Sequence, residues 1–417
     1  MDERIYREYV AILKEELQPA MGCTEPIAVA YCAALARRTL GALPETVEVL
    51  ASANIIKNVK SVIVPNTNGQ RGIAAAAAAG IVSGNADAQL QVLASLTPEQ
   101  VDAVGAYLQQ AAFTVRRADK DYVFDIQVRV TAGADSASVE IAGYHTNVIR
   151  IEKNGVVQFH KDYQESGSQH ATDRSLLTVE QIIAFANEVD IADVQETLQR
   201  QIDYNWAIAE EGLRGDYGAN IGRILLQSYG MSIHNRAKAY AAAGADARMN
   251  GCDLPVVINS GSGNQGLTAS LPVIVYAKEL GVTQQMLYRA LVVSNLVTIH
   301  LKTGIGSLSA YCGATAGVTY LYGGQFREIA HTIVNAIAID SGMICDGAKA
   351  SCAAKIASAV EAGLLGMQMQ MHESQFYGGD GIVVKGVENT IRNIGTLASE
   401  GMRETDRTII RMMIQEH

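Results

Sequence analysis

The chain has 417 residues, of which 48% are hydrophobic and 18% charged, and a formal net charge of −10 at pH 7. This composition is typical of a globular protein with a large core and two or three domains, and it argues against disorder. The acidic balance argues against nucleic acid or an anionic membrane as a partner. The sequence has no apolar run of membrane-spanning length, and the charged first twenty residues do not match a secretory signal. We therefore expect a cytoplasmic protein whose six cysteines are thiols rather than disulfides.

Hydrophobic periodicity divides the chain into two parts. Helical spacing of apolar residues predicts helices at 2–17, 27–43, 73–81 and 98–112, and alternation predicts strands at 46–51, 122–130, 137–142, 147–152 and 156–160. After a polar stretch at 161–174, nearly all periodic segments are helical. We therefore predict an α+β protein with two domains. Residues 1–165 form an N-terminal α+β domain with a small antiparallel sheet, and residues 166–417 form a mainly helical domain.

Cys23 stands directly before a predicted helix. Thr24 is a suitable N-cap and Pro26 a suitable first-turn residue, so the cysteine should lie beside the helix N-terminus. The helix dipole and the free N–H groups at that position lower the pKa of a thiol. The pattern allows two interpretations, a reactive thiolate and a loop cysteine without a chemical role. Cys32 lies within the apolar helix and is expected in the core.

Three polar segments are candidates for binding a small ligand. They are the turn with Asn66, Thr67, Asn68 and Gly69, the strand end with His145 and Asn147, and the glycine-rich loop with Ser260, Ser262 and Asn264. The first and third precede helices, whose N-termini attract anions such as carboxylates. A structural interpretation stays open for each segment, since such turns often only connect elements and a lone histidine is more often structural. The third loop matches neither a dinucleotide fingerprint nor a Walker A loop.

Three further cysteines, Cys312, Cys345 and Cys352, lie among small residues. Three thiolates without an obvious fourth suggest a [4Fe–4S] cluster with one iron open to a substrate. Glycine and alanine around them would allow the backbone to approach the sulfurs closely. Spacing alone favours the other interpretation, in which the three are buried and inert.

An ordered series of motifs adds to this interpretation. In chain order these are MGCTEP, VPNTNGQRG, GYHTN, NSGSGNQG, SAYCGATAG, ICDGAKASC and GVENTIRNIG. Together they span nearly the whole chain, and they resemble the L-cysteine desulfidase family, which is related to the α chain of bacterial iron–sulfur L-serine dehydratases. The resemblance implies a carbon–sulfur lyase that releases sulfide, ammonia and pyruvate from L-cysteine without pyridoxal phosphate.

The resemblance also implies roles for individual residues. Cys312, Cys345 and Cys352 correspond to the ligands of an oxygen-sensitive [4Fe–4S] cluster in the helical domain, and Cys23 corresponds to the active-site thiol. GYHTN is similar to the His-Pro-Asn segment of the serine dehydratases, with Thr in place of Pro, so His145 and Asn147 carry over less directly. Cys252 matches no ligand and is expected to be structural.

Two alternative functions remain open at the level of sequence. One is elimination from L-serine or another β-substituted amino acid, because the pocket around the leaving group decides the substrate. The other is a non-catalytic protein that binds a metabolite or senses redox state through its thiols. In each case we expect a small-molecule ligand, no nucleic acid or membrane, and a homo-oligomer such as a dimer.

Overall fold

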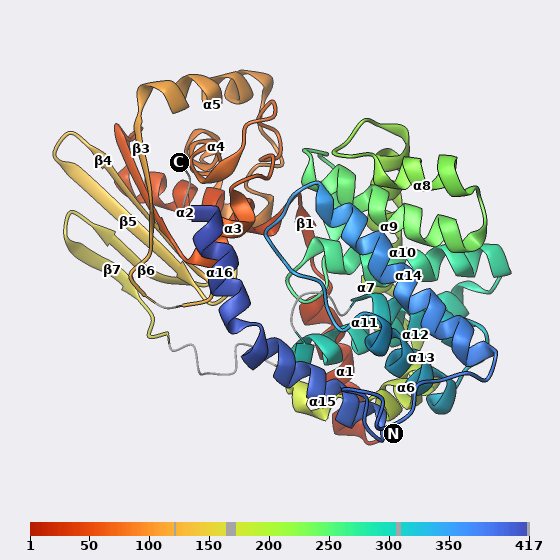
Figure 1. Ribbon diagram of the computed structural model, residues 1–417. Coiled ribbons are helices and arrows are strands. Elements are labelled where there is room, and N and C mark those ends of the chain that lie inside the picture. Colours follow the sequence, from red (N-terminus) through yellow and green to blue (C-terminus); the bar gives the residue numbers. More distant parts are fainter. Residues whose placement is uncertain (121, 164–171, 306–309, 415–417) are drawn as a thin grey trace.

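The computed structural model describes residues 1–120, 122–163, 172–305 and 310–414. It shows two parts lying side by side, one built on a sheet and the other on helices (Figure 1). The predicted α+β class is confirmed. None of the described helices is long and apolar enough to cross a membrane.

The sheet has six strands in the order β3-β2-β4-β5-β6-β7. Their bounds are β2 Thr46–Ala51, β3 Ala112–Arg117, β4 Asp125–Ala132, β5 Asp135–Ala142, β6 Val148–Lys153 and β7 Val156–His160. All pairs are antiparallel except β2 with β3, so the sheet is mixed rather than purely antiparallel as expected. Alternate residues of β4, namely Ile126, Val128 and Val130, are fully buried, because one face of the sheet is covered.

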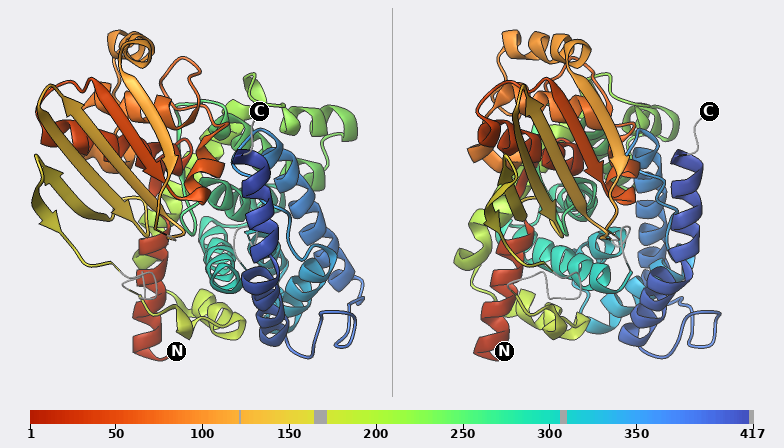
Figure 2. Two further views of the ribbon diagram at one scale, coloured as in Figure 1. Left: turned by 60° about the vertical axis from the view of Figure 1, so that its left-hand side comes forward. Right: turned by 90° about the vertical axis from the view of Figure 1, so that its left-hand side faces the viewer.

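Helices cover that one face, and the sheet forms the outer layer (Figure 2). They are α2 Thr24–Leu40, α3 Ala53–Val59, α4 Gly72–Ser83 and α5 Pro98–Gln110, with a 3₁₀ turn at Ala86–Gln91. α2 and α4 pack closely, since a Cβ at Gly80 would lie 1.9 Å from the carbonyl oxygen of Ala30. The alanine-rich sequence of α4 thus serves a tight helix–helix contact, and this contact fixes α2 against the sheet.

The second part is a bundle of helices around one large core. Its members are α6 Val179–Glu188, α7 Ile191–Arg214, α8 Ile221–Tyr229, α9 Ile233–Met249, α10 Gly263–Leu280, α11 Gln284–Ile305, α12 Ala310–Leu321, α13 Phe326–Ile339, α14 Ser351–Met371 and α15 Val387–Thr396, with a 3₁₀ turn at Arg174–Leu176 and a π-helical turn at Leu397–Gly401. α12 lies directly against α11, because a Cβ at Gly313 would be 2.4 Å from the carbonyl oxygen of Ser294.

The first helix, α1 Glu3–Glu16, packs in the helical part. Its buried residues Tyr9, Ile12 and Leu13 belong to the same core as Phe185. The strand that follows, β1 Pro19–Met21, pairs antiparallel with β8 Pro255–Val257 of the helical part. The chain therefore starts in the helical part, enters the sheet part near Cys23 and returns after β7. The division at residue 165 stays a prediction, but α1 and β1 lie with the part that follows it.

The helix α16 Arg403–Ile414 runs from the helical part back to the sheet part (Figures 1 and 2). Asp406 Oδ1 on this helix is 3.8 Å from Lys57 Nζ on α3. Lys60 Nζ donates a hydrogen bond of 2.8 Å to the carbonyl oxygen of Met413. The two parts are thus connected by a polar contact at the end of the described chain as well as by the chain crossings near β1 and β7.

Candidate functional site

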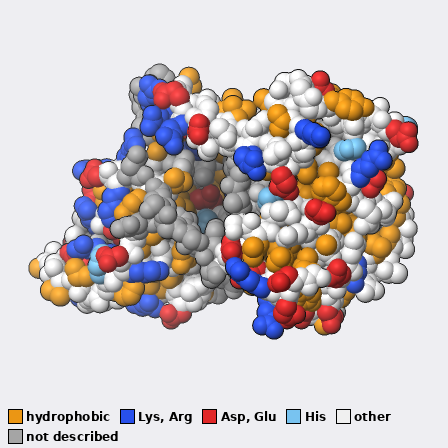
Figure 3. Space-filling model, turned by 90° about the horizontal axis from the view of Figure 1, so that it is seen from below, with side chains coloured by type: hydrophobic (Ala, Val, Ile, Leu, Met, Phe, Trp, Pro, Cys, Tyr) orange, Lys and Arg blue, Asp and Glu red, His pale blue; other side chains and the backbone are white. Residues whose placement is uncertain are grey.

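A cavity of about 1050 Å³ lies between the two parts. Seen from below, the surface is hollowed where they meet (Figure 3). The sheet part contributes the start of α2, helix α3 and the loop with His145, and the helical part contributes the ends of α9 and α11, the start of α10 and the loop before α14. Of the residues predicted from the sequence, the cavity is lined by Cys23, His145, Ser260, Ser262, Asn264, Cys345 and Cys352.

Cys23 lies at the start of α2 as expected, but it is itself the N-cap residue, and the predicted N-cap Thr24 is the first residue of the helix. The Sγ of Cys23 donates a hydrogen bond of 3.2 Å to Oε2 of Glu25. Burial of the side chain, followed by the negative charge of Glu25, raises the pKa of the Cys23 thiol well above its usual value. The expected lowering of this pKa by the helix N-terminus is therefore wrong for this structure, because desolvation and a neighbouring carboxylate outweigh the dipole.

Glu25 is a site residue that the sequence analysis did not assign. Its carboxylate also accepts hydrogen bonds from Thr24 Oγ1 at 3.1 Å and from Asn58 Nδ2 at 3.2 Å. Burial opposes ionisation, but the charges of His145 and Arg248 and the bond from Cys23 lower the pKa of Glu25 overall. The site thus holds a neutral thiol next to an ionised carboxylate.

His145 faces the same cavity from the loop between β5 and β6. Its ring packs edge-on against Phe124 with centroids 4.8 Å apart, and its Nε2 is buried without a hydrogen-bond partner among the described residues. Burial lowers the pKa of His145, and the negative charge of Glu25 opposes that effect. Asn147 plays a different part, since its Nδ2 donates to the carbonyl oxygen of Ala142 and its Oδ1 accepts from Lys161. Asn147 therefore shapes the loop and is not among the residues that line the cavity.

The glycine-rich loop before α10 lines the opposite wall. Ser262 is the N-cap of α10, and its Oγ accepts a bond of 3.4 Å from the backbone N–H of Gln265. Ser260 has a left-handed backbone, φ +50°, and its carbonyl oxygen accepts a bond of 3.2 Å from Lys302 Nζ. All three predicted residues of this loop, Ser260, Ser262 and Asn264, line the cavity, and their contact with a substrate stays a prediction.

The turn with Asn66, Thr67, Asn68 and Gly69 lies outside the cavity lining. Asn66 Nδ2 donates to the carbonyl oxygen of Leu93 at 2.8 Å. Thr67 Oγ1 donates to the carbonyl oxygen of Val64 at 2.7 Å. These side chains stabilise the turn itself, and their predicted contact with a substrate gains no support from the geometry.

Two of the three predicted cluster cysteines line the cavity. Cys345 lies in the loop before α14 and Cys352 in the first turn of that helix, and both line the cavity half-buried. Cys312 is buried in α12, next to Tyr311, which lines the cavity. Among the described residues, no group of three or more His, Cys, Asp and Glu side chains is arranged to hold a metal ion. Cys345 and Cys352 border one cavity and have the thiol side chains that iron–sulfur clusters use as ligands, whereas Cys312 is not among the residues that line it.

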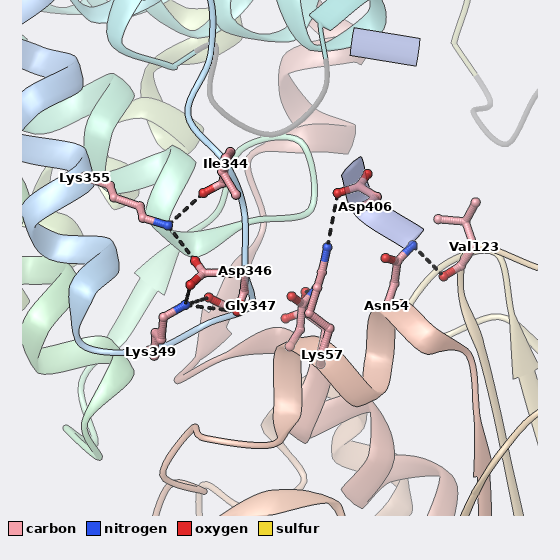
Figure 4. A network of polar contacts seen from close by, with 11 residues as sticks. Asn54, Lys57, Val123, Ile344, Asp346, Gly347, Lys349, Lys355 and Asp406 are labelled. Atoms are coloured by element: carbon pink, nitrogen blue, oxygen red, sulfur yellow. Dashed lines mark hydrogen bonds and ion pairs between the residues drawn. The ribbon is translucent and has the colours of Figure 1, made fainter. Parts of the chain in front are cut away.

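A set of ion pairs braces the loop that carries Cys345 (Figure 4). Asp346 lies 2.5 Å from Lys355 Nζ and 2.6 Å from Lys349 Nζ. Partial burial opposes ionisation, but the hydrogen bonds from Lys349 and Lys355 lower the pKa of Asp346 to about 2. Gly347, with φ +91°, lies against α3, since a Cβ there would be 2.2 Å from the carbonyl oxygen of Lys57. The loop is thus fixed to α14 on one side and to the sheet part on the other.

Two cations in the cavity wall were also not predicted from the sequence. Arg248, in the last turn of α9, is 3% exposed, and Lys302 lies near the end of α11. Burial lowers the pKa of Lys302, while the charges of Glu16, Glu25 and Cys345 oppose that effect. The sequence around Arg248 resembles an ordinary charged helix end, with Asp246 two residues before it, so it holds no clear signal for this role.

Comparison with known proteins identifies the family to which the chain belongs. A family model described as the serine dehydratase alpha chain matches residues 87–411. A UPF0597 protein of Desulfitobacterium hafniense is 56% identical over 421 residues, which cover 99% of this chain and 98% of the relative. UPF0597 proteins of Lachnoclostridium phytofermentans and Treponema denticola are 48% and 44% identical over at least 98% of each chain. The predicted relationship to the serine dehydratase alpha chain is confirmed, and the chain belongs to that family together with these UPF0597 proteins.

Proposed function

We propose that the protein is an iron–sulfur-dependent β-elimination lyase that acts as an L-cysteine desulfidase. The observation that carries the proposal is one cavity lined by Cys23, paired with Glu25, and by Cys345 and Cys352. Cys312, Cys345 and Cys352 would hold the [4Fe–4S] cluster. When bound, such a cluster supplies an iron without a protein ligand that acts as a Lewis acid toward the substrate.

The reaction requires a base at Cα of the substrate. The Cα–H bond breaks, its electron pair forms the Cα–Cβ double bond, and hydrosulfide leaves Cβ. The resulting 2-aminoacrylate tautomerises and is hydrolysed by one water molecule to pyruvate and ammonia. In our proposal Cys23 takes the Cα proton, and Glu25 accepts the proton that the thiol carries at rest.

The substrate itself would change the state of this pair. Glu25 raises the pKa of Cys23 through its charge. An α-ammonium group bound beside Glu25 would offset that charge and favour the thiolate. The ring of His145 and the loop with Ser260, Ser262 and Asn264 supply polar groups on the remaining walls.

A second candidate is elimination of water from L-serine. The match to the serine dehydratase alpha chain favours it, since the two reactions differ only in the leaving group. The test is to reconstitute the protein anaerobically with iron and sulfide, and then to measure pyruvate from L-cysteine and L-serine together with sulfide from L-cysteine. We expect about four irons per chain, the content of one [4Fe–4S] cluster, and a larger kcat/KM for L-cysteine.

The outcomes separate the candidates. A larger kcat/KM for L-serine would replace the desulfidase by a dehydratase. A colourless protein without iron after anaerobic reconstitution, and without pyruvate from either substrate, would leave a non-catalytic binding protein.

A further inference from the structure

Arg248 has no acidic partner among the described residues, although its side chain is buried. Its Nη1 donates a hydrogen bond of 2.9 Å to Asn264 Oδ1 and contacts Met249 Sδ at 3.6 Å. Its Nε is buried without a hydrogen-bond partner among the described residues. A guanidinium has five N–H donors and keeps its charge at every physiological pH, so the Nε–H group remains available to a ligand.

An isolated buried charge is costly, by several kcal/mol for a typical ion. Another arginine on the same cavity wall shows the usual solution. Arg174 is also largely buried, and it pairs with Glu16 and lies 3.6 Å from Glu15. Arg248 differs, because the neutral amide oxygen of Asn264 replaces the carboxylate. Although its charge also acts on Glu25, the guanidinium makes no salt bridge among the described residues and can therefore bind an anionic ligand.

The N-terminus of α10 lies at the same place. A Cβ at Gly263, the first residue of this helix, would be 2.2 Å from Arg248 Nε, so the arginine lies directly against the first turn. The first N–H groups of a helix and the positive end of its dipole attract anions. Two independent features, a buried guanidinium and an 18-residue helix pointing its N-terminus at the cavity, thus favour the same kind of ligand.

We infer that Arg248 and the first turn of α10 form the subsite for the α-carboxylate of the substrate. The inference rests on the proposed function for its substrate class, an α-amino acid, and adds the group that recognises the acid end. It also assigns a role to Gly263, since any side chain at this position would displace the guanidinium. Glu25 lines the same cavity, and its charge would attract the α-ammonium group of a substrate whose carboxylate is held here.

The test compares a ligand with and without its carboxylate on proteins with and without the guanidinium. Pyruvate and its neutral counterpart pyruvamide are titrated into the anaerobically purified protein, and the dissociation constants are measured by ligand-observed NMR. We expect the unaltered protein to bind pyruvate at least tenfold more tightly than pyruvamide, the usual scale for one charge-assisted hydrogen bond. In Arg248→Met the ratio should fall to about one, while Arg248→Lys should keep part of it.

Lys57→Met is the matched control, because it removes a cavity-lining cation that already has an acidic partner, Asp406. This variant should keep the tenfold preference. Gly263→Ala provides a second route, since it displaces the guanidinium without removing its charge, and it should also lower the ratio. This variant decides the matter if Arg248→Met does not fold.

An unchanged preference in both Arg248→Met and Gly263→Ala, or no preference in the unaltered protein, would overturn the subsite. Either result combined with normal elimination would leave the proposed function standing. A third outcome is a preference for pyruvate in a protein that eliminates neither sulfide nor water. It would retain the carboxylate subsite and reject the lyase.

Discussion

Cys23 and Glu25 form a thiol–carboxylate pair at the start of α2, with Sγ 3.2 Å from Oε2. The two residues are separated by Thr24, whose hydroxyl group lies 3.3 Å from the carbonyl oxygen of Gly261 in the helical part. The pair therefore lies where the two parts of the molecule meet. Its chemistry can be tested separately from that of the cluster.

Replacing Cys23 by alanine should leave the iron content unchanged and reduce turnover on the order of a hundredfold or more, the usual scale for a general base. The iron content should not change because Cys23 is not assigned as a ligand, and turnover should fall because Cys23 lines the cavity. Iron per chain and sulfide released from L-cysteine are measured on the same reconstituted sample. Full iron with near-normal sulfide release would exclude Cys23 from the mechanism, and loss of iron would make it a ligand.

Replacing Glu25 by glutamine should lower the pKa of Cys23, because the carboxylate charge is a cause of its elevation. The rate of alkylation of Cys23 by iodoacetamide, followed by mass spectrometry of its peptide, should then rise at a lower pH than in the unaltered protein. Asn58→Asp serves as a comparison, since it adds a negative charge next to Glu25 and should shift the profile to higher pH. A profile that does not move in either variant would contradict the coupling of the pair.

Serine in place of Cys312, Cys345 or Cys352 should abolish the visible absorbance of the cluster, because each change removes one of three protein ligands. Cys32→Ala is the control. Cys32 is also a buried cysteine, but its Sγ donates to the carbonyl oxygen of Val139 in the sheet part. Undiminished iron in any of the three serine variants would show that the ligand assignment is wrong.

Replacing Gly347 by alanine should loosen the contact between the two parts of the molecule. The added Cβ would lie 2.2 Å from the carbonyl oxygen of Lys57, so the loop before α14 must move. Gly342→Ala is a matched control, because it also places alanine at a positive φ, but no atom of the described residues lies within 4 Å of the new Cβ. We expect faster limited proteolysis and a lower Tm for Gly347→Ala than for Gly342→Ala. Equal behaviour of the two variants would mean that only backbone strain matters.

Asp246 should make part of the stability depend on pH. Burial raises the pKa of its carboxyl to about 6, although its oxygens accept hydrogen bonds from the N–H groups of Ala219 and Ile221. The folded state therefore binds a proton more tightly than the unfolded state, and this group adds stability as the pH falls from about 6 toward 4.

The measurement is urea unfolding of the protein and of Asp246→Asn at pH 7 and pH 5. The gain in free energy of unfolding between the two pH values should be smaller in the variant by on the order of 1 kcal/mol. The variant keeps only one acceptor oxygen and can therefore be less stable at both pH values. Only the change in the free energy of unfolding between pH 7 and pH 5 is compared. An identical pH dependence in both proteins would be inconsistent with the raised pKa.

The sequence predicts elements well where burial alternates or recurs along the chain. Strand β2 has the predicted bounds, Thr46–Ala51, because its inward residues are apolar and buried. Strand β3, Ala112–Arg117, was missed, because it is a short edge strand whose residues are almost all exposed and which directly follows a helix. Helix α12 was missed because Gly313 and Gly317 read as loop residues, whereas they allow close packing on α11.

The candidate site was predictable only in part for a similar reason. Cys23, Cys345 and Cys352 could be recognised from motifs, since their chemistry is visible in the residue type. The roles of Glu25 and Arg248 depend on which charges meet in three dimensions, and the Cys23 pKa depends on burial that a helix-start pattern does not contain. Sequence therefore indicated the reactive groups but not the charges that control them.

The position of α1 has a consequence for how the protein is made. Its apolar face, with Tyr9, Ile12 and Leu13, packs against helices that begin after Leu177. At translation rates of about 5–20 residues per second, that face leaves the ribosome roughly 10–30 seconds before its partners exist. The sheet part, which is continuous in the chain between β1 and β7, can fold within this interval. A nascent chain would then carry a folded sheet part preceded by α1, whose apolar face is still exposed. A chaperone that binds the nascent chain would bind it in this form.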